Sequence, residues 1–165
     1  MRIVYLDTSA IIKRYLQETG TDLITSLYSK VWLGDLKIAF SFWNIGEVLG
    51  VLDRYFRRGW LSREDYELAK LEFLGETLKM LRLRTLKIIP VKTSIITKTW
   101  DLIEKYHIYQ ADALQIVSAR EAGAKELYTA DQTLCKVGVE EQLEVNCLED
   151  PMLDVDSSHW SSPSR

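Results

Sequence analysis

The chain has 165 residues, of which 47% are hydrophobic and 27% are charged. This length and composition predict one globular domain that folds without disulfide staples, and they exclude a largely disordered chain. The formal net charge of −3 excludes a protein that holds nucleic acid through an overall positive charge. The two cysteines form no CxxC motif, which predicts neither a disulfide framework nor a zinc site and indicates a reducing compartment.

Neither a secretory signal nor a membrane span is predicted. No basic-then-apolar segment opens the sequence. The most apolar window, residues 38–52, contains Glu47 and is too short to cross a bilayer. We therefore expect a cytoplasmic location and no membrane partner.

Short apolar runs alternate with stretches of helical periodicity along the chain. This alternation predicts an α/β fold of three layers, α/β/α, around a parallel and roughly five-stranded sheet. Strands are predicted at 3–6, 37–41, 87–91, 125–129 and 144–148. Helices are predicted at 11–17, within 20–35, and at 43–58, 61–86, 94–106 and 111–122, with a further helix after Asp131.

Local signals predict several helix ends. Thr21 is expected to cap a helix whose apolar stripe includes Leu23. Ser62 with Asp65 resembles a capping box, and Gly59 is expected to end the preceding helix. One domain is expected over 1–149, followed by a polar, Ser-rich tail over 150–165 that should be loose and that leaves Trp160 without a role.

Two aspartates follow predicted strands in similar surroundings. The stretches "VYLDTSA" and "LYTADQTL" each combine a buried strand, an aspartate near a small hydroxyl and then a helix, and they carry Asp7 and Asp131. In open parallel sheets, ligands bind beyond the carboxyl ends of the strands, so the two carboxylates converge if these strands are neighbours. Each aspartate alone is equally typical of a helix N-cap.

Two further acids lie on predicted helices. Glu47 points away from the apolar stripe of its helix, towards a face with Trp43 and Val51, so it is either exposed at a rim or buried with a partner such as a metal ion. Asp112 lies in the first turn of a helix of small residues, where it either stabilises the helix dipole or points inward.

Clustered carboxylates indicate a metal-dependent chemistry. They repel one another unless protons or cations hold them together, and hard oxygen ligands favour Mg²⁺ or Mn²⁺ over zinc. Such ions bind phosphate oxygens and activate water for phosphodiester hydrolysis. No phosphate loop, GxGxxG, GxSxG or HExxH motif supplies another chemistry.

Three segments resemble the motifs of PIN-domain nucleases, particularly the stand-alone toxins of the VapC type in type II toxin–antitoxin systems. They are "VYLDTSAIIKRY", "FSFWNIGEVLGVL" and "ADALQIVSAREAGAKELYTADQTL", within a resemblance that covers residues 1 to about 148. It implies a five-stranded parallel sheet and Mg²⁺- or Mn²⁺-dependent cleavage of single-stranded RNA. It also implies a homodimer and a small antitoxin partner. Asp7, Glu47, Asp112 and Asp131 would be the catalytic metal ligands, and Thr8 and Thr129 would orient carboxylates or waters.

Two alternatives share this fold. One is a PIN nuclease of RNA processing, and the other is a non-catalytic module that binds a protein through the apolar surface of the 61–86 helix. Basic residues concentrate in the middle of the chain, either as a solvated helix face or as a phosphate-binding flank. The candidate RNA contacts are Arg57, Arg58, Arg82 and Arg84.

Overall fold

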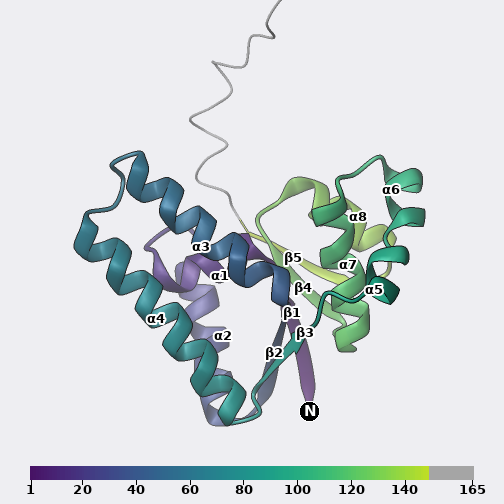
Figure 1. Cartoon of the computed structure of the whole chain (residues 1–165). Coiled ribbons are helices and arrows are strands. Elements are labelled where there is room, and N and C mark those ends of the chain that lie inside the picture. Colours follow the sequence, from purple (N-terminus) through teal and green to yellow (C-terminus); the bar gives the residue numbers. More distant parts are fainter. Residues whose placement is uncertain (149–165) are drawn as a thin grey trace, which may run out of the picture.

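The computed structural model describes residues 1–148, and the predicted tail at 150–165 lies outside them. Five strands form one sheet in the order β3-β2-β1-β4-β5, and every neighbouring pair is parallel (Figure 1). The predicted fold class is therefore confirmed. The strands are β1 (Arg2–Leu6), β2 (Leu36–Ser41), β3 (Leu86–Ile89), β4 (Glu126–Thr129) and β5 (Glu144–Cys147).

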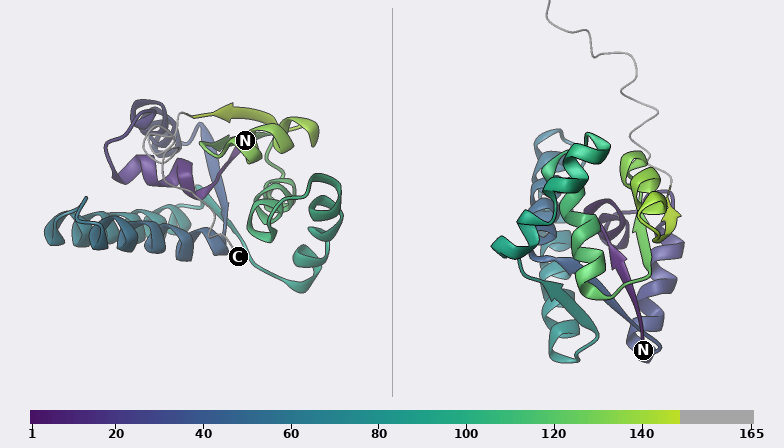
Figure 2. Two further views of the ribbon diagram at one scale, coloured as in Figure 1. Left: turned by 90° about the horizontal axis from the view of Figure 1, so that it is seen from above. Right: turned by 90° about the vertical axis from the view of Figure 1, so that its right-hand side faces the viewer.

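Helices cover both faces of the sheet and complete the three layers. The first group consists of α1 (Thr8–Tyr15), α2 (Thr21–Leu33), α3 (Phe42–Arg57) and α4 (Arg63–Arg82). The second consists of α5 (Thr93–Thr97), α6 (Trp100–Tyr106), α7 (Gln110–Ala122) and α8 (Gln132–Glu140). The two groups lie on opposite sides of the sheet, as the view from above shows (Figure 2), and each contributes to its own hydrophobic cluster.

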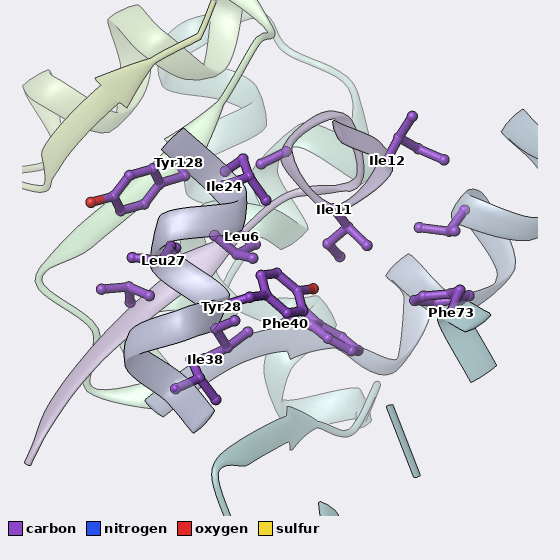
Figure 3. Packing of buried hydrophobic residues seen from close by; sticks show 14 of the residues in the cluster. Leu6, Ile11, Ile12, Ile24, Leu27, Tyr28, Ile38, Phe40, Phe73 and Tyr128 are labelled. Carbon is purple, nitrogen blue, oxygen red and sulfur yellow. The ribbon is translucent and has the colours of Figure 1, made fainter. Parts of the chain in front are cut away.

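Strand β1 divides its side chains between the two clusters. Val4 and Leu6 pack with α1 and α2, whereas Tyr5 packs with α7 on the other face. This alternation follows from the period of two along a strand. Because both faces are buried, the strand reads as a continuous apolar run, as parallel strands typically do. Figure 3 shows the first cluster, where Leu6 lies among Ile11, Ile24 and Leu27.

Two predicted helix starts are wrong by a few residues. Helix α1 begins at Thr8 rather than Ile11, because Asp7 accepts a hydrogen bond from the backbone N–H of Ala10 and caps the helix. The N-cap of α2 is Gly20, with φ of 91°, so Thr21 is the first helical residue instead of the cap. Leu23, expected in the apolar stripe, is exposed, and the buried stripe of α2 starts at Ile24.

The helix predicted at 94–106 is two short helices. Helix α5 ends at Thr97 and α6 begins at Trp100. Between them the buried hydroxyl of Thr99 donates to the backbone oxygen of Ile96 at 2.6 Å. Threonine bonds of this kind compete with regular helix hydrogen bonding and interrupt the pattern.

The cysteine spacing led us to expect no disulfide, and this expectation is wrong. Cys135 on α8 and Cys147 at the end of β5 form a disulfide, with Cα atoms 5.7 Å apart. Helix α8 packs very close to β5 at Gly138, where an added Cβ would lie 2.7 Å from Cγ2 of Val145. This close packing brings the two cysteines together, so the cysteine spacing gives no information about the redox compartment.

The described residues contain no helix that is long and apolar enough to span a membrane.

Candidate active site

Asp7 and Asp131 lie at the same edge of the sheet. Strand β1 pairs with β4 in parallel register, with Leu6 opposite Tyr128, and the backbone N–H of Asp7 donates to the oxygen of Tyr128 at 3.2 Å. Each aspartate follows the carboxyl end of its strand and caps the next helix, α1 or α8. The sequence left open whether these aspartates cap helices or converge at one site, and in the structure they do both.

The carboxylate of Asp7 is held by three hydrogen bonds. Its Oδ1 accepts from the hydroxyl of Ser9 at 2.7 Å and from the N–H of Ala10 at 2.9 Å, and its Oδ2 accepts from the hydroxyl of Thr129 at 2.8 Å. Only 5% of the residue is exposed. Burial raises the pKa of Asp7 to about 6, the three hydrogen bonds oppose this rise, and the charge of Asp131 adds to it.

Asp131 uses one oxygen for capping and keeps the other available. Its Oδ1 accepts from the N–H of Leu134 at 2.8 Å, and its own N–H donates to the hydroxyl of Thr129 at 2.9 Å. Within residues 1–148, Oδ2 of Asp131 accepts no hydrogen bond. That oxygen is free to bind a cation or a water molecule.

Glu47 reaches the same place from α3. The hydroxyl of Thr8 donates to its Oε2 at 2.6 Å, and the amide of Gln115 lies 3.5 Å from the same oxygen. Oε1 accepts no hydrogen bond from the described part of the chain. Thr8 donates to Glu47 and the next residue, Ser9, donates to Asp7, so adjacent hydroxyls hold the two acids.

Asp112, in the first turn of α7, is half-buried beside the other acids. Burial is the largest cause of its raised pKa, followed by the negative charge of Asp131, and the charge of Glu47 contributes as well. The inward position of Asp112 is therefore the one that the structure adopts.

All four carboxylates line one cavity of about 300 Å³. Among residues 1–148, no three His, Cys, Asp or Glu side chains converge closely enough to enclose a metal ion as they stand. The donor set nevertheless fits a hard divalent cation, because it consists of carboxylate and hydroxyl oxygens and includes the free oxygens of Glu47 and Asp131.

Comparison with known proteins identifies the family. The family model described as "PIN domain" matches residues 4–140. The chain belongs to the PIN-domain family. The search of curated proteins finds no significant match.

Solved structures with the same PIN fold are distant in sequence. VapC20 of Mycobacterium tuberculosis, a toxin that cleaves the sarcin-ricin loop, is 15% identical, with a TM-score of 0.59 over 82% of this chain and 95% of that one. FitAcB of Neisseria gonorrhoeae is 14% identical, with a TM-score of 0.58 over 86% and 95%. VapBC2 of Rickettsia felis, bound to a DNA fragment from its promoter, is 16% identical, with a TM-score of 0.57 over 89% and 99%.

A buried amide pair supports the acids of this PIN domain, and sequence reasoning missed it. Oδ1 of Asn44 accepts from the backbone N–H of Ser41 at 2.8 Å. Its Nδ2 donates to the hydroxyl of Thr8 at 2.9 Å and to Oε1 of Gln115 at 3.0 Å. The hydroxyl of Tyr5 donates to the same Gln115 oxygen at 2.8 Å. Asn44 and Gln115 each stand in an otherwise apolar stretch, and this pattern could have indicated the network, because a buried amide needs hydrogen-bond partners.

The sequence-based arginine candidates lie outside the cavity. Arg57 pairs with Asp53 at 2.8 Å, and Arg58 stacks on the ring of Trp60. Arg82 ends α4 and Arg84 lies between α4 and β3, at the amino ends of the strands, whereas the acids follow the carboxyl ends. The arginine that lines the cavity is Arg54.

Proposed function

We propose that this PIN-domain protein is a divalent-metal-dependent endoribonuclease that hydrolyses phosphodiester bonds of single-stranded RNA with Mg²⁺ or Mn²⁺. The observation that carries the proposal is the convergence of Asp7, Glu47, Asp112 and Asp131, from four separate segments, on one cavity. Membership of the PIN family supports the same conclusion.

The four acids are proposed as the metal ligands, and Thr8 and Thr129 as the residues that orient them. A bound ion would lower the pKa of water and stabilise charge on the phosphate oxygens. The hydroxyl of Thr8 donates to Oε2 of Glu47, and Oε1 accepts no hydrogen bond from residues 1–148, so Oε1 is available as a metal ligand. Asp7 must be deprotonated to act as a ligand, and because its pKa is about 6, a metal ion has to compete with a proton for this carboxylate in mildly acidic solution.

We further propose that the protein is the toxin of a toxin–antitoxin pair. The fold is shared with VapC20, a toxin, and with VapBC2, which was solved with promoter DNA. A nuclease of RNA processing would use the same chemistry, and a short neighbouring reading frame that encodes an antitoxin-like peptide separates the two. A non-catalytic binding module is the remaining alternative, and failure to bind Mg²⁺ or Mn²⁺ in titration calorimetry would favour it.

A protein partner is supported by the exposed surface of α4. Leucines recur there at intervals of three and four residues, which is the spacing of an apolar seam between helices. We propose that this seam forms a homodimer interface. The exposed residues are Leu68, Leu71, Leu74, Leu78 and Leu81.

The decisive experiment is cleavage of mixed single-stranded RNAs with Mg²⁺, with Mn²⁺ and with excess chelator. Asp7→Asn and Asp112→Asn should each lose at least a hundredfold in rate and remain folded by circular dichroism. Asp101→Asn is the matched control for Asp112→Asn, because Asp101 lies exposed in the first turn of α6, outside the cavity, and it should cleave normally. Cleavage in excess chelator, or full activity of both site variants, would refute the proposal.

A further inference from the structure

The cavity is larger than a metal site requires. Its volume of about 300 Å³ is at the lower end of the range for sites that take small organic ligands. The acids occupy one part of its lining. A second part comes from α1, the residues that follow it and the second half of α3, and it combines carbon surface with charges. These residues are Ile12, Lys13, Glu18, Val51, Arg54 and Tyr55.

The charge of Lys13 is already balanced. The side chain is 1% exposed, and its Nζ lies 3.4 Å from Oε2 of Glu18. The hydroxyl of Tyr55 donates to Oε1 of the same glutamate at 3.3 Å. This group of three contributes shape and little net charge to the cavity.

Arg54 is different, because its charge is unbalanced. Within residues 1–148 its guanidinium has no ion-pair partner, although Arg57 one turn later is paired with Asp53. Arg54 is exposed in the last turn of α3 and lines the cavity. An arginine in this position presents a planar set of donors that suits a phosphate group.

The position of Arg54 relative to the acids follows from the helix. Glu47, Val51 and Arg54 are separated by four and three residues, so they lie on one face of α3. Seven residues correspond to a rise of about 10 Å along the helix axis. The backbone of Arg54 therefore lies about two turns from Glu47 and in line with it along the cavity, a separation that suits the phosphate next to the one at the acids.

The wall beside Glu47 and Arg54 suits the uncharged part of a nucleotide. Val51 and Ile12 offer carbon surface, and the ring of Tyr55 packs edge-on against Trp60 at 5.1 Å between centroids. An aromatic ring fixed by its neighbours is a surface on which bases of single-stranded nucleic acid stack.

We propose that this part of the cavity is a subsite for the nucleotide next to the cleaved bond, with Arg54 binding the neighbouring phosphate and with Val51 and Tyr55 contacting the sugar or base. The inference rests on the proposed ribonuclease function and deepens it, because it predicts that the protein holds at least two consecutive phosphates of a single strand.

The test compares Arg54→Gln with Arg63→Gln. Arg63 is an exposed arginine outside the cavity that stacks on Phe56, so its replacement makes the same change of charge. Binding of a fluorescent single-stranded RNA is measured by anisotropy across a series of salt concentrations, with Asp112→Asn in every protein to prevent cleavage. Arg54→Gln should bind roughly tenfold more weakly. It should also lower the slope of log K against log salt by about 0.7, the value for one phosphate contact on a single strand, whereas Arg63→Gln changes neither.

A second arm locates the contact. RNAs that carry one neutral methylphosphonate linkage at successive positions are bound to each protein. One linkage beside the cleavage position should weaken binding by the protein with Arg54 and leave binding by Arg54→Gln unchanged. Equal slopes and equal linkage profiles for the Arg54→Gln and Arg63→Gln proteins would overturn the subsite.

The outcomes separate the subsite from the nuclease proposal. If the wild type cleaves RNA and Arg54→Gln behaves as Arg63→Gln does, the subsite fails and the nuclease proposal stands. If Arg54-dependent binding is found but the wild type cleaves with neither ion, the phosphate contact of Arg54 stands, whereas the nuclease proposal and the placement of that contact beside a cleaved bond both fail. If the wild type neither binds nor cleaves RNA, both are overturned.

Discussion

The hydroxyl of Thr129 donates a hydrogen bond of 2.8 Å to Oδ2 of Asp7, across 122 positions of sequence. The same hydroxyl accepts a bond of 2.9 Å from the backbone N–H of Asp131. Thr129 is fully buried at the end of β4. One side chain therefore fixes the relative positions of two proposed metal ligands, so its removal should alter the site without opening the core.

Replacing Thr129 by valine tests this connection. The two side chains have similar shape, but valine leaves Oδ2 of Asp7 and the N–H of Asp131 without this partner, at a cost of about 1–3 kcal/mol. We expect a cleavage rate at least tenfold lower, and an apparent pKa of Asp7 higher than in the wild type because a hydrogen bond to the charged form is lost. Rates are measured across pH, and Thr97→Val, at an exposed position, is the control. An unchanged pH profile in Thr129→Val would contradict the connection.

The pKa of Asp7 predicts how the stability of the metal-free protein depends on pH. Folding raises this pKa from 3.8 to about 6, so the folded protein binds the proton more tightly than the unfolded chain. Stability from this group is then highest below about pH 4 and falls by about 3 kcal/mol as pH rises to about 6. The Asp7→Asn variant has no such titration, so its stability should not fall over this pH range and should exceed that of the wild type at pH 7.5.

The measurement is chemical unfolding of both proteins in chelator between pH 4 and pH 8. The difference between them isolates Asp7 from other groups that titrate in this range, such as Asp112, whose pKa is also raised. A difference that does not vary with pH would contradict the raised pKa. In the wild type, affinity for Mn²⁺ should fall below about pH 6, because protons and the ion compete for the same carboxylate.

The features of this fold that depend on local sequence pattern could be predicted. Strand β1 and the position of Asp7 at its end follow from an apolar run that stops at a carboxylate. The contacts of Asn44 and Gln115 could not be predicted, because they depend on how α3 and α7 face each other across β1. The same is true of Arg54, which lines the cavity, whereas Arg57 on the same helix pairs with Asp53 outside it.

The cysteine pair shows a further limit of sequence reasoning. Cys135 and Cys147 are 12 residues apart, and only the return of the chain from α8 to β5 brings them together. Closing a loop of this size should stabilise the fold by about 3 kcal/mol, chiefly by restricting the unfolded chain.

Reduction should therefore lower the melting temperature of the wild type. The double variant Cys135→Ser/Cys147→Ser should melt at the lower temperature with or without reductant, and thiol counting by mass spectrometry should find no free cysteine in the oxidised wild type. Equal melting temperatures of the oxidised and reduced wild type would contradict a stabilising disulfide.

The leucine seam of α4 provides a test of the proposed dimer. Leu71 is 70% exposed and lies two helical turns from Leu78, on the same face. Leu71→Glu/Leu78→Glu should be monomeric in light scattering and lose little stability as a monomer, because both side chains already contact water in the isolated chain. Val139→Glu, at a position on α8 that is 61% exposed and lies on the other side of the sheet from α4, should keep the oligomeric state of the wild type. A monomeric wild type at micromolar concentration would refute the homodimer and leave the seam to a different protein partner.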